Sequence, residues 1–490
     1  MRTQRASRVA DAVSGRLLGR DRWVSGAVID SREATDGSLF FALPGSRTDG
    51  HRFVADARAR GASAAVVSSP GCANGARIVV DDPGQALLRL ARWERAGLSA
   101  AVVGITGSVG KTTTKDFTAC LLAEAYRTVA SPRSYNNQIG VPLTILSADD
   151  RTEVLVSELG AGTVGEIAEL CGIVRPQIGV VTAVAPAHLE TFGSMRRIAR
   201  AKAELVEALP PDGVAILNAD DGVVSSFARR TRARVVRFGR AQCADVRAED
   251  VELDPSGRAR FHLVHGRARS RAELPVVGAH MVSAALAATA CAIVLGVPLG
   301  ECADRLGSVR ASPGRMEELS TSTGVRVLHD AYNANPGSVT AGLRALAAAR
   351  GGVPALAVLG PMAELGRRSR REHERVGRLA AGLDLAGLVT IGEEGRWIAH
   401  GALRAGMAPT LVRWCRDREE ALAVVRERTS TGDVVLVKAS RAAGLDWLTD
   451  ALSTEIVGGS AFQDEADGPG EASLEILGER VSEVGDDRHP

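Results

Sequence analysis

Aromatic residues, paired cysteines and an excess of either charge are all scarce in this sequence of 490 residues. Aromatic side chains make up only 3% of it, while alanine, glycine and arginine abound, a bias typical of GC-rich genomes that supports no functional conclusion. The seven cysteines are scattered without a C-x-x-C pair, so neither a zinc site nor a disulfide framework is predicted, and reduced cytosolic thiols fit best. With 60 basic and 58 acidic residues, no overall field would draw the protein to nucleic acid or to an anionic membrane.

Long hydrophobic runs are missing as well. Residues 1–22 are rich in arginine and contain no apolar core, which excludes a secretory signal. Only residues 276–300 lack charged side chains for long enough to span a membrane, but they are weakly hydrophobic and are interrupted by Gly296 and Pro298. We therefore expect a buried helix from about Met281 to Leu295, and a cytoplasmic protein without membrane insertion.

A phosphate-binding loop is the most informative feature that is present. Residues 103–115 read V-G-I-T-G-S-V-G-K-T-T-T-K, in which an apolar strand runs into a glycine turn and then into a helix. N–H groups at the start of a helix point at a bound anion. Lys111 would reach the β- and γ-phosphates of ATP or GTP, and the Thr112 hydroxyl would hold Mg²⁺.

The loop departs from the strict P-loop pattern at one position. That pattern needs a glycine five residues before Gly110, where this sequence has Ile105, and the nearest glycines are Gly104 and Gly107. The sequence therefore predicts a variant loop, T-G-x-x-G-K-T. A glycine-rich turn without a phosphate role is the alternative.

Apolar strand-like runs alternate with helical patterns along nearly the whole chain, which predicts an α/β protein with mainly parallel sheets. We expect a small N-terminal α/β domain over residues 1–99, a central nucleotide-binding domain over 100–311 and a third α/β domain over 312–453. Residues 454–490 are acidic and glycine-rich with little apolar patterning, and they are predicted to form a disordered tail.

Three further polar residues follow the loop along the chain. Glu158 ends a predicted strand, where carboxylates of α/β sheets often face the ligand, so it is a candidate Mg²⁺ ligand or simply a solvated glutamate. His188 follows another strand, and Lys202 lies in the helical pattern A-K-A-E-L-V. Taken alone, a single histidine and a single helical lysine are more often structural than catalytic.

The order of these motifs resembles the Mur ligases, which build the peptidoglycan stem peptide. The resemblance rests on an ordered series of segments: T-G-S-V-G-K-T-T, Y-N-N-Q-I-G-V-P-L-T, S-E-L-G-A, A-H-L-E, A-K-A-E, L-N-A-D-D, S-P-G-R-M-E and D-A-Y-N-A-N-P-G-S. The segments 30–53, 362–366 and 435–441 resemble the subgroup that adds D-alanyl-D-alanine to UDP-N-acetylmuramoyl-tripeptide. This resemblance covers residues 25–452 and implies three domains: an N-terminal acceptor-binding domain, a central P-loop-type ATP-binding domain and a Rossmann-like C-terminal domain.

The resemblance also implies a reaction and the residues that perform it. ATP would convert a carboxylate into an acyl phosphate, and an amine would displace the phosphate to form an amide. The implied catalytic residues are Lys111, Glu158, His188, Lys202 and Arg315. The implied Mg²⁺ ligands are Thr112, Glu158, His188 and, once carbamylated by CO₂, Lys202.

Binding residues follow from the same resemblance. Those implied for ATP are Thr106, Gly107, Ser108, Val109, Gly110, Lys111, Thr112, Thr113, Asn137, Asp330, Tyr332, Asn333 and Asn335. Those implied for the UDP-linked acceptor are Ser31, Arg32, Thr48, Asp49 and Gly50. Those implied for the carboxylate of the incoming dipeptide are Ser440 and Arg441. A guanidinium suits a carboxylate because it forms two parallel hydrogen bonds. The family norm is a monomer.

Several positions depart from the family pattern. Met281 and Ala284 replace two asparagines that include an adenine contact, and the other departures are Ser134, Gly162, Thr163, Ala183, Pro361 and Ala439. These departures leave open a second hypothesis, a Mur-type paralogue that joins a different amine and carboxylate in secondary metabolism. A catalytically silent nucleotide-binding scaffold is a third hypothesis, which the intact catalytic set disfavours.

Overall fold

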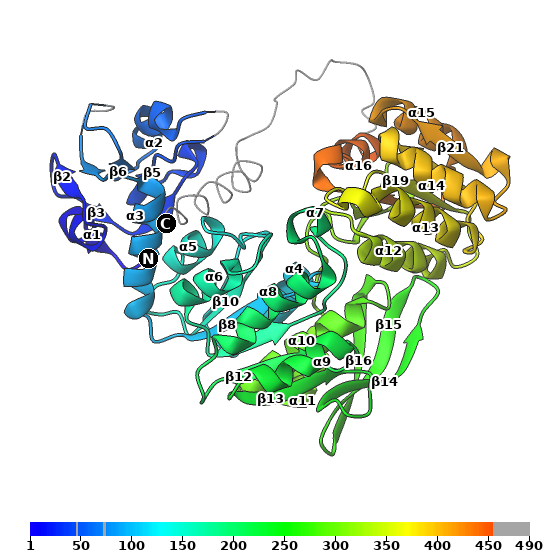
Figure 1. Cartoon of the computed structure of the whole chain (residues 1–490), viewed down its shortest axis with the longest axis horizontal. Helices are drawn as coiled ribbons and strands as arrows, with labels where there is room; N and C mark the ends of the chain where they lie inside the picture. The colour runs from blue at the N-terminus through cyan, green and yellow to red at the C-terminus, as the bar shows by residue number, and fades with distance from the viewer. Residues whose placement is uncertain (46–47, 72–74, 454–490) are drawn as a thin grey trace, which may run out of the picture.

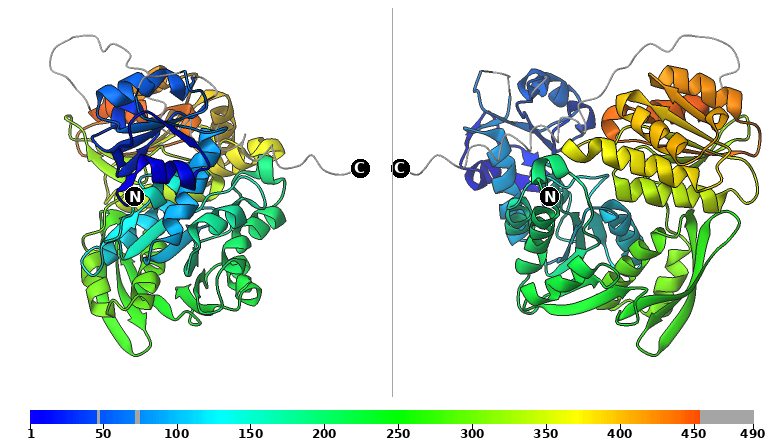
Figure 2. Two further views of the ribbon diagram at one scale, coloured as in Figure 1. Left: turned by 90° about the vertical axis from the view of Figure 1, so that its left-hand side faces the viewer. Right: turned by 45° about the vertical axis from the view of Figure 1, so that its right-hand side comes forward.

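The computed structural model describes residues 1–45, 48–71 and 75–453. These residues form three α/β lobes in chain order, and the first and third lobes both stand on the central one (Figures 1 and 2). The architecture confirms the predicted α/β fold class. The acidic tail predicted for residues 454–490 lies outside the described residues.

The first lobe is built on a five-stranded sheet in the order β2-β7-β6-β5-β4. Its strands are β2 (Arg16–Leu18), β4 (Gly26–Val28), β5 (Ser38–Phe41), β6 (Ala64–Val67) and β7 (Arg77–Val79), beside a small pair of β1 (Gln4–Arg5) and β3 (Trp23–Val24). Its helices are α1 (Ala6–Ala12), α2 (Val54–Ala59) and α3 (Pro83–Ala96), with short 3₁₀ turns η1 (Ser31–Glu33) and η2 (Gly50–Phe53). The strands β5, β6 and β7 form where short, mainly apolar runs are bounded by turn residues.

The central lobe contains a nine-stranded sheet in the order β16-β15-β14-β13-β12-β11-β8-β10-β9. The strands β8 to β14 pair in parallel, and β14, β15 and β16 add an antiparallel ribbon that the sequence analysis did not anticipate. The strands are β8 (Ala101–Thr106), β9 (Thr128–Ala130), β10 (Val154–Glu158), β11 (Ile178–Val181), β12 (Val214–Asn218), β13 (Arg234–Gly239), β14 (Val246–Leu253), β15 (Arg258–His265) and β16 (Ala268–Val277). The ribbon was missed because its strands carry charged residues in place of apolar runs.

Helices cover both faces of this sheet (Figure 1). They are α4 (Lys111–Leu122), α5 (Gly140–Leu146), α6 (Glu166–Val174), α7 (Leu189–Phe192), α8 (Met195–Glu207), α9 (Gly222–Ser226), α10 (Met281–Val294) and α11 (Leu299–Leu306), with the 3₁₀ turn η3 (Phe227–Arg230). The helix α10 packs on α4 and is buried almost throughout, which confirms the buried helix predicted there. Within the described residues, no helix is long and apolar enough to cross a membrane.

The third lobe has a six-stranded sheet in the order β17-β18-β22-β19-β20-β21. The strands are β17 (Glu317–Ser320), β18 (Arg326–Asp330), β19 (Ala355–Leu359), β20 (Gly387–Ile391), β21 (Val412–Cys415) and β22 (Val434–Lys438). The helices are α12 (Pro336–Ala349), α13 (Ser369–Ala381), α14 (Gly392–Arg404), α15 (Arg418–Arg428) and α16 (Asp446–Ser453), with turns η4 (Gly366–Arg368), η5 (Pro409–Leu411) and η6 (Arg441–Ala443). All its strands but β17 run parallel, so the carboxyl ends of β18, β19 and β22 meet at one edge.

Candidate active site

The phosphate loop joins the end of β8 to the start of α4 and requires glycine at two positions. Gly110 has a φ of 80° and Gly107 a φ of 152°, which L side chains rarely adopt. A Cβ on Gly107 would lie 1.9 Å from Oγ1 of Thr182, so the turn leaves no room for a side chain there. Ser108 N–H donates to the Ala183 carbonyl at 2.8 Å, which anchors the loop to the segment after β11. The variant loop is therefore preorganised by packing.

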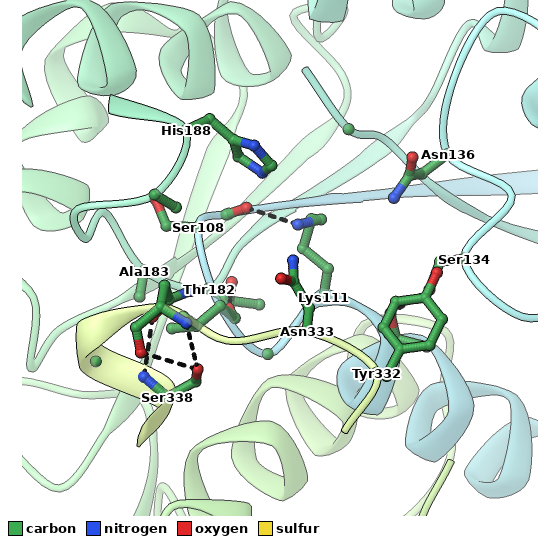
Figure 3. A pocket seen from close by; sticks show the side chains of 18 of the residues that line it. Ser108, Lys111, Ser134, Asn136, Thr182, Ala183, His188, Tyr332, Asn333 and Ser338 are labelled. Carbon is green, nitrogen blue, oxygen red and sulfur yellow. Dashed lines mark hydrogen bonds between the residues drawn. The ribbon is translucent and has the colours of Figure 1, made fainter. Parts of the chain in front are cut away.

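Lys111 begins α4 and its ammonium folds back toward the loop. Its Nζ donates to the Gly107 carbonyl at 3.1 Å (Figure 3). Burial lowers the pKa of Lys111, Glu158 opposes that shift and Arg315 adds to it. A bound polyphosphate would supply the nearby negative charge that stabilises the protonated form of this buried lysine.

Glu158 is held at the end of β10 by the neighbouring segments. The Thr112 hydroxyl donates to its Oε2 at 2.8 Å, and Asn136 Nδ2 donates to its Oε1 at 2.8 Å. The backbone N–H of Glu158 donates to the Ser131 hydroxyl at 3.1 Å. Because β8 and β10 pair in parallel with Glu158 beside Ile105, this carboxylate lies next to the phosphate loop. Two hard oxygen atoms, from Thr112 and Glu158, thus lie together beside the loop, a donor set that suits Mg²⁺.

Lys202, in the middle of α8, is buried and has no carboxylate within ion-pair distance among the described residues. Burial, reinforced by the charge of Lys111, lowers the pKa of Lys202 to about 7. Its Nζ lies 5.7 Å from the centre of the Phe192 ring. A substantial fraction of Lys202 is therefore neutral near pH 7, as nucleophilic attack by a lysine amine requires.

His188 lies at the boundary between the central and third lobes. Its backbone is left-handed, with a φ of 52°, and its Nδ1 contacts Oε2 of Glu364 from the third lobe. The contact with His188 lowers the pKa of Glu364, against a smaller opposing effect of burial. Groups of three or more histidine, cysteine or acidic side chains arranged to hold a metal do not occur within the described residues.

Arg315 reaches back from the third lobe to the phosphate loop region. Its NH2 donates to the Ser134 hydroxyl at 3.1 Å, and its guanidinium lies 4.2 Å from the centre of the Tyr332 ring. Arg441 packs on the same ring at 5.4 Å. The Ser134 hydroxyl also lies 3.2 Å from Oγ1 of Thr112, so Ser134 connects Arg315 of the third lobe to the start of α4.

Two residues of the predicted binding set, Asp330 and Ser440, already have partners within the protein. Asp330 forms a buried ion pair with Lys438, whose Nζ lies 2.6 Å from Oδ2. Ser440 is buried, accepts a hydrogen bond from Ala363 N–H at 2.8 Å and donates to the Ala334 carbonyl at 3.2 Å. The side chains of Asp330, predicted to bind ATP, and of Ser440, predicted to bind the incoming dipeptide, therefore both already have partners within the protein.

Two asparagines of the predicted nucleotide set bind the starts of helices. Asn335 caps α12, because its side chain accepts from Ser338 N–H at 2.9 Å, and such a cap contributes about 1 kcal/mol. Asn137 lies before the capping residue of α5 and accepts from Gly140 N–H at 2.9 Å. Asn333 and Tyr332 lie in the loop between β18 and α12 and line the same cleft as Lys111 (Figure 3).

A cleft of about 530 Å³ brings most of these residues together. The predicted residues that line it are Gly107, Ser108, Val109, Gly110, Lys111, Thr112, Thr113, Asn137, Glu158, His188, Lys202, Arg315, Asp330, Tyr332, Asn333, Asn335 and Arg441. Thr106 and Ser440 lie behind the lining, and Met281 and Ala284 form part of it. Its size is that of an ordinary small-molecule site.

The residues predicted to bind the UDP-linked acceptor lie apart from this lining, in the first lobe. Arg32 pairs with Asp30 at 2.6 Å, and Asp49 pairs with His51 at 2.6 Å. Gly50 packs tightly, since a Cβ there would lie 2.7 Å from the Leu43 backbone. Ser31 is buried in the turn η1, and Thr48 immediately precedes the turn η2 and its capping residue.

Sequence reasoning assigned no role to several polar lining residues, among them Asn136, Glu166, Glu364 and Lys438. Asn136, Glu364 and Lys438 lie inside segments that carry the family resemblance, Y-N-N-Q-I-G-V-P-L-T, 362–366 and 435–441, so the motif signal was present without an assigned role. Glu166 lies outside them, and its carboxylate accepts from Gly162 N–H at 2.8 Å.

Comparisons with known proteins agree with this geometry. Three family models match: the Mur ligase family catalytic domain over residues 24–93, the Mur ligase middle domain over 105–292 and the Mur ligase glutamate ligase domain over 314–441. The chain is 42% identical to the UDP-N-acetylmuramoyl-tripeptide–D-alanyl-D-alanine ligase of Mycobacterium tuberculosis, covering 90% of this chain and 94% of that protein. It is 34% identical to the protein of the same name from Escherichia coli, covering 91% and 97%.

Solved structures give the same result. A crystal structure of MurF from Acinetobacter baumannii superposes with a TM-score of 0.81 at 30% identity, covering 92% of this chain and all (100%) of that one. MurF from Thermotoga maritima, solved in complex with ADP, superposes with a TM-score of 0.75 at 28% identity, covering 88% and 97%. Since the family models and these relatives together span its three lobes, the chain belongs to the Mur ligase family, as its motifs predicted.

Proposed function

We propose that this chain is an ATP-dependent amide ligase that adds D-alanyl-D-alanine to UDP-N-acetylmuramoyl-tripeptide in peptidoglycan precursor synthesis. The observation that carries the proposal is the convergence, on one cleft, of the phosphate loop with Glu158 and Lys202 from the central lobe and Arg315 and Arg441 from the third. The names of the relatives from Mycobacterium tuberculosis and Escherichia coli specify these two substrates.

The first step would activate the carboxylate of the tripeptide. A carboxylate oxygen attacks the γ-phosphorus of ATP, the bond from that phosphorus to the β–γ bridging oxygen breaks, and an acyl phosphate and ADP result. Lys111, at the start of α4, and the amides of the loop would hold the β- and γ-phosphates. Arg315 would offset the charge on the transferred phosphoryl group, the usual contribution of an arginine in phosphoryl transfer.

Thr112 and Glu158 fit Mg²⁺, and His188 lies on the same cleft as a further donor. The ion would neutralise charge on the phosphate oxygens when bound. Lys202 supports the same region: its neutral amine can add CO₂, and the resulting carbamate would carry the negative charge that a lysine otherwise lacks. Phosphate, hydroxyl and carboxylate oxygens would then surround the cation.

The second step would form the amide. The amine of the dipeptide attacks the acyl carbon, phosphate leaves with the electron pair of the C–O bond, and the amine loses a proton. An acyl phosphate hydrolyses readily in water, so the third lobe has to cover the cleft while the intermediate exists. Arg315 and Arg441 bring the third lobe to this cleft, and Arg441 would fix the incoming carboxylate.

A phosphate-release assay with UDP-N-acetylmuramoyl-tripeptide, D-alanyl-D-alanine and Mg-ATP tests the proposal. We expect phosphate release that requires both substrates and is lost in Lys111→Ala. The changes at Met281 and Ala284, which line the cleft, keep a second candidate in the test: a paralogue acting on other substrates. ATP binding without turnover of this pair, but with turnover of another amine, would replace the proposal by that candidate. No turnover with any acceptor would favour the third hypothesis, a catalytically silent nucleotide-binding scaffold.

A further inference from the structure

Among the carboxylates of the described residues that line the cleft, Glu364 differs in that its side-chain partner belongs to another lobe. Glu158 accepts from two side chains of its own lobe, and Glu166 accepts from the loop just before its helix. Asp330 pairs with a lysine of its own lobe. The contact of Glu364 is instead with His188, across the boundary between the lobes.

The backbone holds Glu364 at this boundary at some cost. Glu364 has a φ of 60° and His188 a φ of 52°, both in the left-handed region, which disfavours residues with side chains. The N–H of Glu190 donates to the Glu364 carbonyl at 3.0 Å, which fixes the two loops together. The two side chains remain accessible, with 49% of Glu364 and 39% of His188 exposed. Strain of this kind concentrates at functional sites.

A guanidinium of opposite charge lies on the adjoining loop. Ala363, next to Glu364, donates its N–H to the hydroxyl of Ser440, which immediately precedes Arg441, at 2.8 Å. Ser440 therefore clamps the loop that carries the carboxylate to the loop that carries the guanidinium. Both charged residues line the cleft, and Arg441 is braced against the Tyr332 ring. The third lobe thus presents one negative and one positive group to the cleft from two loops that are tied together.

We propose that Glu364 recognises the ammonium group of the incoming amine substrate, while Arg441 holds the carboxylate at its other end. The proposal rests on the proposed function, since a dipeptide is a zwitterion with charges at its two ends. A carboxylate has two oxygens, so Glu364 can accept from the ammonium and keep its contact with His188. This places the amine beside the side chains of the central lobe that would hold the acyl phosphate. Glu364 is then a residue of substrate specificity, and Ser440 positions it.

An interlobe strut without a substrate contact is the structural alternative. Two ligands that differ only in the amino group distinguish substrate recognition by Glu364 from a purely structural role. D-alanyl-D-alanine and N-propionyl-D-alanine, which lacks the amine, provide that pair. Binding of each is measured by calorimetry to the full chain with Mg²⁺, a non-hydrolysable ATP analogue and UDP-N-acetylmuramoyl-tripeptide. The variants are Glu364→Gln and, as a control, Glu190→Gln, an exposed residue of the same boundary whose side chain lies outside the cleft.

We expect the unmodified chain to prefer the dipeptide by about 10- to 100-fold, the range for a hydrogen bond to a charged group. Glu364→Gln should lose most of this preference for the dipeptide but bind the ATP analogue with unchanged affinity. Glu190→Gln should retain the preference. If Glu364→Gln weakens both ligands equally or changes neither, the inference is wrong and the residue is a strut. If the unmodified chain neither binds nor ligates the dipeptide, the proposed function itself fails, a result that differs from both.

Discussion

The hydroxyl of Thr112, in the first turn of α4, donates a 2.8 Å hydrogen bond to Oε2 of Glu158, at the carboxyl end of β10. The two residues are 46 positions apart in the chain. The parallel pairing of β8 and β10 brings them together beside the phosphate loop. This pair is where we expect Mg²⁺ to bind, and it is the most direct target for mutation.

Replacing Glu158 by glutamine should impair catalysis with little effect on folding. Glutamine keeps the shape of the side chain and can still accept from Thr112, but it lacks the charge that a cation needs. We expect kcat to fall by about 10²- to 10³-fold, the usual effect of removing one electrostatic contribution to a transition state. Phosphate release at saturating Mg-ATP measures it. Glu169→Gln, on the exposed face of α6, is the control, and an unchanged rate in Glu158→Gln would contradict the metal assignment.

Gly107→Ala should disable the phosphate loop. The added Cβ would meet Oγ1 of Thr182 at 1.9 Å, and the φ of 152° is unfavourable for alanine. Strain of about 1 to 3 kcal/mol corresponds to roughly a 10- to 100-fold weaker affinity for ATP if it is relieved by moving the loop. Gly222→Ala, at a glycine with open space around it, should bind ATP normally. Equal ATP affinities in the two variants, measured by calorimetry, would show that the loop geometry does not control binding.

The pKa of Lys202, lowered to about 7 by burial, predicts a pH dependence of activity. Only the neutral amine adds CO₂, and its fraction rises as pH increases through the pKa. At a fixed concentration of dissolved CO₂, activity should therefore rise between about pH 6 and about pH 8. The initial rate of phosphate release measures this.

Lys202→Ala separates this effect from other titrations. The variant should lose activity, and short carboxylates such as acetate should restore part of it without the same rise between pH 6 and 8, since acetate is ionised throughout that range. Full activity of Lys202→Ala without any added carboxylate would exclude a carbamate at this position. Native mass measurement should show the mass of CO₂ on the unmodified chain and not on the variant.

Asp330→Asn should destabilise the third lobe. It would leave Lys438, which is 1% exposed, without its partner, and an unpaired buried charge costs about 3 to 5 kcal/mol. Urea unfolding followed by a probe in the third lobe would measure the change. The double variant Asp330→Asn/Lys438→Met should recover much of the loss, because it removes both charges. If Asp330→Asn weakens ATP binding and leaves unfolding unchanged, the carboxylate contacts the nucleotide and contributes little to the fold.

The part of the cleft lined by Met281 and Ala284, where the family resemblance implies an adenine contact, gives a gain-of-function prediction. Met281 and Ala284 lie in the first turn of α10 and line the cleft, with apolar atoms where the family has side-chain amides. Ala284→Asn should lower KM for ATP about fivefold and leave KM for GTP unchanged, since a well-formed hydrogen bond contributes about 1 kcal/mol. Parallel phosphate-release assays with the two nucleotides measure this selectivity. An equal change in both KM values would show that the position does not face the base.

Local pattern was enough for much of the fold. The loop at residues 106–113, the strand that ends at Glu158 and the apolar helix α10 were all predicted within a residue or two, because each has a composition with one physical outcome. The ribbon of β14, β15 and β16 was not, since its alternation is charged and its stability comes from pairing with the parallel sheet. Pairing between strands depends on the whole sheet and cannot be read from one segment.

The chain's own sequence determined the chemistry: a glycine turn before Lys111 and Thr112 suits a polyphosphate because of backbone freedom and helix N–H groups. Only the tertiary structure decided which groups act on one another. It paired Asp330 with Lys438, used Ser440 to tie two loops together and set Glu364 against His188 from another lobe. The physical reason is that motif order specifies which residues are present, whereas ion pairs, burial and pKa depend on neighbours that are far away in the chain.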